Sequence, residues 1–131
     1  GYWSRGLGDV YKRQVSTTLR KFKSSGSNFN DLIVVIGPCI GKDNYEVRND
    51  FLDKFIKQEK SNKKFFKTKR NKIYFSLIDY IKDQLVKFGV KNIEIIKKDT
   101  YLLSNNFFSA RRSIKNKLND YGRNISVIMI K

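Results

Sequence analysis

The sequence predicts an α+β (mixed α/β) fold in which mixed β-sheets pack against amphipathic helices, and it predicts that this domain is incomplete. Apolar residues recur at helical spacing over residues 46–58 and 77–88. Short apolar runs rich in β-branched residues lie before, between and after these two segments. Strands and helices therefore alternate along the chain, which is typical of sheets covered by helices.

Length and composition indicate one globular domain. A chain of 131 residues, 40% hydrophobic and 14% aromatic, is long enough for one core and too short for two complete domains. No apolar run approaches the ~20 residues of a membrane-spanning helix, and the first residues lack the pattern of a signal peptide. We therefore expect a cytoplasmic protein with no membrane partner. One cysteine and no histidine exclude an internal disulfide and a zinc site of the usual Cys/His type.

The first residues differ in pattern from the rest. Residues 1–14 show neither helical nor strand periodicity, and Ser4 to Gln14 resembles a translated sequencing adapter. We therefore assign residues 1–14 to a non-native segment and residues 15–131 to the domain; a native terminus is the alternative. The spacing of Val15, Leu19 and Phe22 then predicts the end of a helix.

The central elements follow from periodicity and capping residues. The continuous run over residues 32–36 predicts a strand buried on both faces, which Gly37-Pro38 ends. A helix is expected from Glu46 to about Gln58. Residues 60–72 form a basic connection with a short strand at Phe65-Phe66, and residues 73–75 form a strand. Ser76 caps the next helix, and Gly89 ends it.

The last third of the chain is expected to contain three strands, separated first by a loop and then by a turn or helical stub. Residues 93–96 predict a strand, and residues 97–106 a loop. A further strand is expected over residues 107–111, followed by an exposed turn or helical stub over residues 114–120. The apolar run over residues 125–130 predicts the final strand.

Two motifs combine residues that suit a binding site. Gly37-Pro38-Cys39-Ile40-Gly41 follows a strand, and glycine lets the backbone approach a ligand closely, although a plain turn is the alternative. Cys39 lacks a histidine to activate it, so we interpret it as a small structural residue.

The second motif is Phe107-Phe108-Ser109-Ala110-Arg111-Arg112. Its aromatic rings could stack on a purine, and its guanidinium groups could hold phosphate or ribose oxygens. The alternative is a strand with its rings in the core and its arginines in solvent. Arg123, in Tyr121-Gly122-Arg123, is either a pocket residue or a surface residue at the start of the last strand.

Taken in order, the Gly37 motif with its following Tyr45-Glu46-Val47, the Phe107 motif and Gly122-Arg123 resemble the C-terminal half of the laccase-domain family. This family was formerly called multicopper polyphenol oxidases and is now regarded as zinc-dependent purine nucleoside phosphorylases. The similarity runs from about Val15 to the end of the chain. The resemblance implies no catalytic and no metal-binding residue here, and it implies these substrate-binding residues: Gly37, Phe108, Ser109, Arg111, Arg112 and Arg123. Ala110 and Asp99 depart from the tyrosine and cysteine usual in the family.

The resemblance also implies a cofactor and substrates for the full-length protein. Family members hold zinc, or copper, through two histidines and a cysteine that would precede Val15, and this chain has no such residues there. The family reactions are phosphorolysis of adenosine, inosine or methylthioadenosine and deamination of adenosine, so purine nucleoside and phosphate are the expected partners. Without ligands for zinc, the chain is expected to be inactive alone, and its own enzymatic status stays open.

Two other functions remain as alternatives. The net charge of +16, from 28 basic and 12 acidic residues, attracts polyanions nonspecifically, although a low-GC genome also enriches lysine. A nucleic-acid-binding module would use Phe65 and Phe66 between basic residues to stack bases; otherwise these rings anchor the core. A scaffold protein without catalysis is the other alternative.

Overall fold

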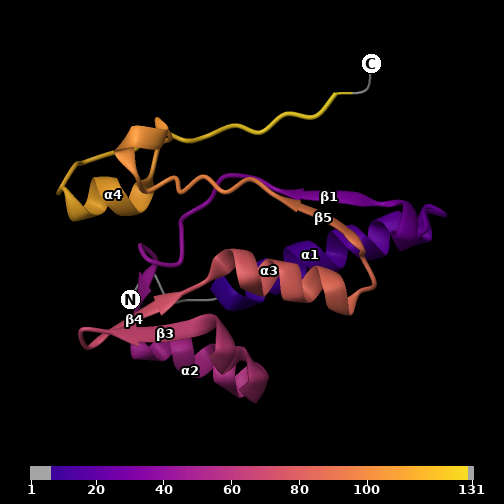
Figure 1. Ribbon diagram of the computed structural model, residues 1–131, viewed down its shortest axis with the longest axis horizontal. Helices are drawn as coiled ribbons and strands as arrows, with labels where there is room; N and C mark the ends of the chain where they lie inside the picture. The colour runs from indigo at the N-terminus through magenta and orange to yellow at the C-terminus, as the bar shows by residue number, and fades with distance from the viewer. Residues whose placement is uncertain (1–6, 130–131) are drawn as a thin grey trace.

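The computed structural model describes the backbone of residues 7–129 and the side chains of residues 13–129. Its elements interleave helices and strands, which confirms the mixed α/β class (Figure 1). In chain order they are α1 (Leu7–Ser24), η1 (Phe29–Asp31), β1 (Ile33–Ile36), β2 (Glu46–Val47), α2 (Asn49–Gln58), η2 (Lys60–Phe65), β3 (Phe66–Lys69), β4 (Lys72–Phe75), α3 (Leu77–Lys87), β5 (Asn92–Ile95), η3 (Leu103–Asn105) and α4 (Ala110–Lys115), where η marks a 3₁₀ helix.

The parallel and antiparallel pairings lie in two separate small sheets. β1 and β5 pair in parallel, with Ile33 opposite Asn92 and Ile36 opposite Ile95. The other sheet is antiparallel in the order β2–β4–β3. The two strands of the β3–β4 hairpin are joined at Arg70 and Asn71, which both have positive φ, as the right-handed twist of a two-residue hairpin loop requires.

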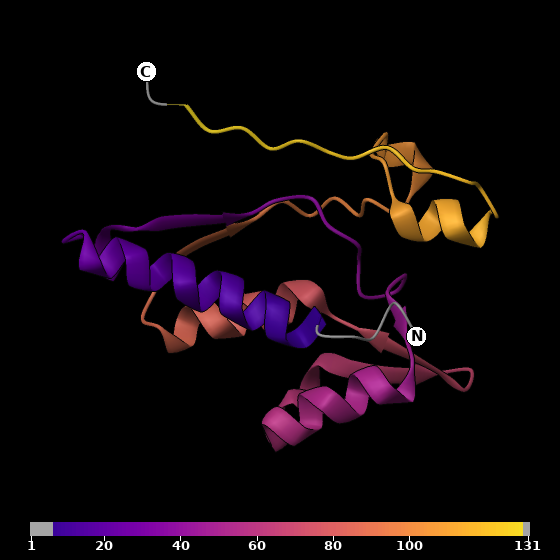
Figure 2. The same cartoon turned by 180° about the vertical axis from the view of Figure 1, so that it is seen from behind.

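A first core lies between the β1–β5 pair and the helices α1 and α3. Figures 1 and 2 show both helices on one side of this pair. The buried side chains are Leu19 from α1, Ile36 from β1, Leu85 from α3 and Val90. The predicted positions Val15 and Leu19 therefore lie on the inner face of α1, whereas Phe22 is exposed, and the predicted apolar face of α3 packs here through Leu85.

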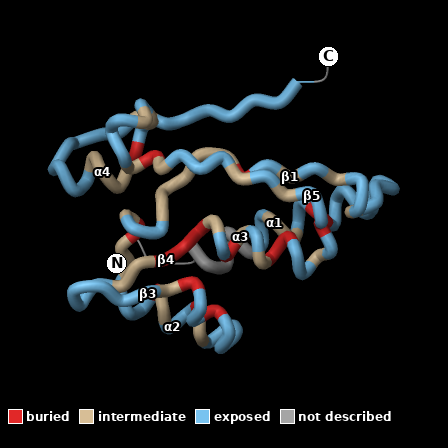
Figure 3. Tube along the Cα trace, viewed as in Figure 1, coloured by how far each residue is buried: buried red, intermediate tan, exposed pale blue. Residues whose placement is uncertain are grey.

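A second, aromatic core fills the space between α2, α3 and the antiparallel sheet. Its buried members are Tyr45, Phe51, Phe55, Phe65, Phe75, Leu77 and Tyr80. The rings of Phe51 and Phe55 stack with centroids 4.8 Å apart, and Phe75 is fully buried between them and Tyr80. Figure 3 shows buried backbone at β4 and the start of α3, where this core is centred.

Predicted capping residues position α3. The Ser76 hydroxyl accepts a hydrogen bond from the backbone N–H of Asp79 and donates one to its carboxylate. The helix ends before Gly89, whose φ of +94° is the left-handed conformation expected at this position. Both predictions are confirmed.

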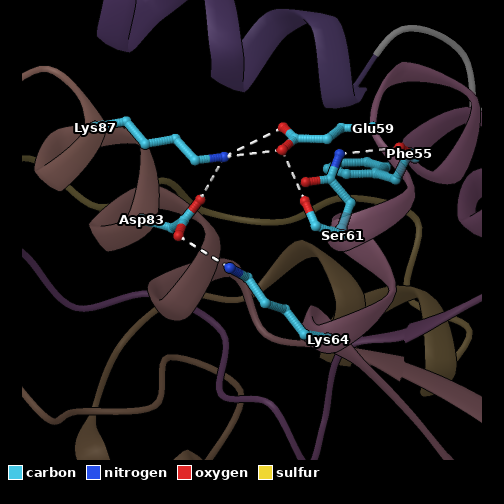
Figure 4. Close-up of polar contacts among 7 residues, drawn as sticks. Phe55, Glu59, Ser61, Lys64, Asp83 and Lys87 are labelled. Atoms are coloured by element: carbon cyan, nitrogen blue, oxygen red, sulfur yellow. Dashed lines mark hydrogen bonds and ion pairs between the residues drawn. The ribbon is translucent and has the colours of Figure 1, made fainter.

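Charged side chains join α3 to η2 at the edge of the aromatic core (Figure 4). Lys87 forms ion pairs with Asp83 and Glu59, each with a nitrogen–oxygen distance of 3.1 Å, and Lys64 pairs with Asp83 at 3.2 Å. A hydrogen bond from Ser61, with the nearby Lys87, lowers the pKa of Glu59. Beneath this network the buried Asn62 side chain donates to the Phe55 carbonyl at 2.9 Å, which ends α2 inside the core.

Two helix boundaries differ from the sequence prediction. α1 begins at Leu7 and passes Gln14 and Val15 without a break, so the expected absence of regular structure before Val15 is wrong for residues 7–14. Arginine, lysine and glutamine in this stretch favour a helix despite the neighbouring glycines. The non-native assignment of residues 1–14 stays a prediction, and residues 1–6 lie outside the described part.

α2 begins at Asn49 because Glu46 and Val47 pair with β4.

Two predicted strands in the last third are wrong. Residues 107–109 precede α4, which begins at Ala110 because the Ser109 side chain caps it. Residues 125–129 are extended but form no strand within residues 7–129, since no neighbouring strand pairs with them. The strand over residues 33–36 is confirmed, but its predicted burial on both faces is wrong because Ile33 and Val35 are exposed.

No helix in the part of the chain that the structure describes combines the length and apolar character needed to cross a membrane.

The aromatic core should control stability. Replacing Phe55, which is 1% exposed, with alanine (Phe55→Ala) removes a ring packed against four others and should lower the free energy of unfolding by about 3–5 kcal/mol. Phe22→Ala removes the same ring from a side chain that is 45% exposed and should cost less than about 1 kcal/mol. Urea unfolding followed by circular dichroism measures both free energies. Equal losses would contradict the burial of Phe55 in the aromatic core.

Candidate functional site

The turn after β1 packs against a loop from the other end of the chain. Cys39 forms an isolated parallel bridge with Asp99, and its carbonyl accepts a hydrogen bond from the Thr100 N–H at 3.1 Å. This bridge lies beyond the ends of β1 and β5 and continues their parallel course. The Gly37 motif is therefore fixed against residues 99–101.

Asp99 organises this contact through both carboxylate oxygens. Oδ1 accepts from the Tyr101 N–H at 2.8 Å, and Oδ2 accepts from the Asn44 amide at 2.6 Å. A Cβ at Gly41 would lie 2.4 Å from Asp99 Oδ2, so this carboxylate occupies the space that only glycine leaves open. The sequence pattern did not identify Asp99 as a site residue. The available signal is an aspartate in a predicted loop, because this residue type often accepts a hydrogen bond from the backbone N–H two residues later, as in an Asx turn.

The surroundings of Cys39 agree with its interpretation as a small structural residue. Burial, together with the negative charge of Asp99, raises the pKa of its thiol to about 11. The thiolate is the nucleophilic form, so this environment suppresses nucleophilic chemistry. The side chain instead packs at the margin of the aromatic core.

Arg112 ties the loop before it to α4. Its Nη1 donates to the carbonyls of Thr100 at 3.1 Å and Tyr101 at 2.8 Å, and its Nη2 donates to the carbonyl of Phe107 at 2.7 Å. These bonds satisfy three backbone acceptors in a segment with little regular structure. The geometry shows Arg112 holding the walls of the site, and whether it also reaches a substrate stays a prediction.

Arg111 and Ser109 connect α4 to its surroundings. Arg111 donates from Nη1 to the Glu46 carbonyl at 2.6 Å, and its guanidinium lies 5.3 Å from the centre of the Tyr45 ring. Ser109 is buried, and its hydroxyl accepts from the Arg112 N–H at 3.2 Å. The motif at residues 107–112 is thus joined to Tyr45 and Glu46, which follow the Gly37 motif in the sequence.

Phe108 and Arg123 form a more exposed part of the site. The Asn124 amide accepts from the Phe108 N–H at 2.9 Å and donates to the Phe108 carbonyl at 2.8 Å, as a neighbouring strand would. The Phe108 ring covers Gly122, where a Cβ would lie 2.4 Å from the ring. Phe108 nevertheless stays 57% exposed, and the exposed Arg123 lies over the Tyr121 ring. The role of Asn124 has no signal in the sequence.

Gly37 lies apart from these side chains. It lines an apolar groove beside α1 and β1, together with Pro38 and Ser126. None of Phe108, Ser109, Arg111, Arg112 and Arg123 lines that groove. The six predicted substrate-binding residues therefore divide into one cluster at α4 and residues 121–124, and a separate glycine.

The donor atoms of this chain do not fit a zinc or copper site. The sequence has no histidine, and its single cysteine has a raised thiol pKa, which opposes the thiolate that a metal needs. Within residues 7–129 no group of three histidine, cysteine, aspartate or glutamate residues lies close enough to share a metal ion. Ligands for zinc would have to come from outside this chain.

The proposed base-stacking surface at Phe65 and Phe66 is absent. Phe65 is buried, and Phe66 packs against the aromatic core with its ring 4.9 Å from that of Phe75. Phe65 at the end of η2 and Phe66 at the start of β3 therefore anchor the core, as the alternative interpretation expects.

The close approach at Gly41 gives a matched pair of substitutions. Gly41→Ala must displace Asp99 from two hydrogen bonds and should lower the free energy of unfolding by about 1–3 kcal/mol. Gly37→Ala meets no atom within 4 Å and should leave stability unchanged or slightly raised. Urea unfolding compares the two variants, and an equally destabilising Gly37→Ala would show that Asp99 is not the cause.

The raised pKa of Cys39 predicts slow alkylation. At pH 8 iodoacetamide should modify the folded chain at least about tenfold more slowly than the urea-unfolded chain, because less thiolate is present. As pH rises, the rate should level off near 9.0 for the unfolded chain but continue to rise towards about 11 for the folded chain. The single cysteine makes mass spectrometry unambiguous; equal rates at pH 8 would contradict the burial of this thiol.

Comparison with known proteins places this arrangement in a family. The family model described as multi-copper polyphenol oxidoreductase laccase matches residues 5–131. A purine nucleoside phosphorylase of Rickettsia prowazekii is 33% identical over an alignment of 131 residues that covers 98% of this chain and 52% of that protein. One from Rickettsia conorii is 34% identical over 113 residues, covering 85% of this chain and 45% of the relative.

A more distant relative and a solved structure agree. A purine nucleoside phosphorylase of Bacteroides thetaiotaomicron is 32% identical, over 87% of this chain and 42% of its own length. The crystal structure of the Bacillus licheniformis hypothetical protein YfiH superimposes with a TM-score of 0.65 at 29% identity, over 80% of this chain and 40% of that chain. The chain spans about half the length of the curated relatives it matches. It belongs to the laccase-domain, YfiH-like purine nucleoside phosphorylase family.

Proposed function

We propose that this chain supplies the C-terminal half of a purine nucleoside phosphorylase that cleaves adenosine, inosine or methylthioadenosine with phosphate. The observation that carries the proposal is a family match over nearly the whole chain combined with a donor set that does not fit a metal. The relatives bear the name of this activity and are about twice as long as the matched segment. Zinc and its ligands then belong to the N-terminal half, and this chain is inactive alone.

Within that enzyme, the site residues of this chain act by positioning and binding. Arg112 and Asp99 hold the loop at residues 99–107 through backbone contacts, and Arg111 holds α4 against β2. Phe108 and Arg123 keep exposed side chains on two segments that meet, because the Phe108 ring covers Gly122 and the Asn124 side chain bonds to the Phe108 backbone. We assign Phe108 to stacking on the purine and Arg123 to phosphate or ribose oxygens.

Activity should appear only when the two halves are joined. A fusion of the unmatched N-terminal part of the Rickettsia prowazekii relative with this full chain should release purine base from inosine or adenosine in the presence of zinc and phosphate. The chain alone should release none. In the fusion, Arg123→Ala should raise the KM for phosphate or nucleoside by about 10- to 100-fold, the loss of one charge-assisted hydrogen bond. Base release measured by absorbance gives both results.

The control removes an arginine of equal charge from the surface of α1. Arg20→Ala changes the net charge equally and should leave both KM values unchanged. Zinc-dependent turnover by the chain alone, or equal effects of the two arginine substitutions, would contradict the proposal.

A further inference from the structure

β1 has the sequence of a strand that is covered on all sides but lies at the edge of a two-stranded sheet. Its only partner within residues 7–129 is β5. Parallel strands with continuous apolar sequences are normally buried on both faces, and sheets normally contain more than two strands. Val34 and Ile36 face the core, whereas Ile33 is 71% and Val35 51% exposed. Within the described part of the chain, no element therefore covers the exposed face of β1, and no strand pairs with its second edge.

One backbone edge of β1 is also unpaired within residues 7–129. The Ile36 carbonyl accepts a hydrogen bond from the Ile96 N–H at 2.9 Å, so Ile36 directs its backbone groups towards β5. In a parallel strand alternate residues direct their N–H and C=O groups to opposite edges. Ile33 and Val35 therefore direct theirs to the edge that no strand occupies, which is a template for another strand.

A groove of about 610 Å³ runs beside this open edge. α1 contributes Val15, Leu19 and Phe22 to its lining, and Leu32 with the four residues of β1 line the opposite wall. The wall is mostly apolar, as the side chains of an inserted strand would require. Residues 125–129 of this chain extend past the groove, but only Ser126 lines it and the neighbouring apolar side chains are 80–98% exposed. Figures 1 and 2 show this segment running beyond the β1–β5 pair on the side away from α1 and α3.

We propose that the open edge of β1 binds an added β-strand from the part of the relatives that this chain does not match, which under the proposed function is the N-terminal half of the domain. This inference rests on the proposed function, because the occupant is that same half. The share of the relatives that lies outside the match is large enough to supply it, since the chain covers 52% of one relative and 40% of the YfiH chain. The added strand pairs with the backbone at Ile33 and Val35, and its side chains fill the groove against α1.

Amide hydrogen exchange in the fusion described above tests the pairing without requiring turnover. The Ile96 N–H, which is bonded to Ile36, is the internal reference for a folded β1–β5 pair. With an added strand, the amides of Ile33 or Val35 should exchange at least about 100-fold more slowly in the fusion than in the chain alone, because exchange then requires the strand to open. Fast exchange at both amides in a fusion that protects Ile96 would overturn the proposal.

Two lysine substitutions test whether the exposed face of β1 differs from another exposed apolar position. Val35→Lys places a charge on the face next to the open edge and should lower the midpoint of thermal unfolding of the fusion by several degrees. Val86→Lys changes a residue of similar exposure, 55% against 51%, on α3, and should leave the midpoint nearly unchanged. Equal shifts would contradict a specific role for β1.

The other occupants give different results. If a second copy of this chain pairs with β1, the chain alone forms a dimer with protected Ile33 or Val35 amides, and the proposal fails. If the fusion protects these amides but does not cleave nucleosides, the added strand stands and the proposed function fails. If the fusion cleaves nucleosides but leaves these amides unprotected, the proposed function stands and the added strand fails.

Discussion

The parallel pairing of β1 with β5 is the interaction on which the rest of this structure depends. It joins segments that lie far apart in the sequence, and its course continues into the bridge between Cys39 and Asp99. That bridge holds the turn after β1 against the loop that Asp99 and Arg112 organise. The position of α4, and with it Phe108 and Arg111, follows from this loop. The pairing of these two four-residue strands thus determines where the motif at residues 107–112 lies.

Elements determined by local chemistry could be predicted from the sequence. Ser76 and Gly89 define the ends of α3 because a hydroxyl cap and a residue with positive φ act within one turn. The buried face of α2 also followed from periodicity, since Phe51 and Phe55 fall on one face of this helix. The resemblance of ordered motifs identified the family, which composition alone could not do.

Elements determined by distant contacts could not be predicted. An apolar segment becomes a strand only if it finds a partner, so residues 125–129 stay unpaired although their sequence favours a strand. The strand expected at Phe107 became the start of a helix because Ser109 caps Ala110. Within the site, the arginines of the second motif were recognised, but their bonds to backbone carbonyls depend on a fold that spacing does not reveal. Asp99 was interpreted only as a departure from the family, whereas it occupies the space beside Gly41.

The proposed function gives the absence of histidine and the exposure of β1 one common explanation, in which residues outside this chain complete both the site and the sheet. Zinc binding tests this claim most directly. Isothermal titration should detect no site tighter than the micromolar range in this chain, and one high-affinity zinc per molecule in its fusion with the N-terminal part of the Rickettsia prowazekii relative. One tightly bound zinc in the chain alone, or none in a folded fusion, would contradict the account.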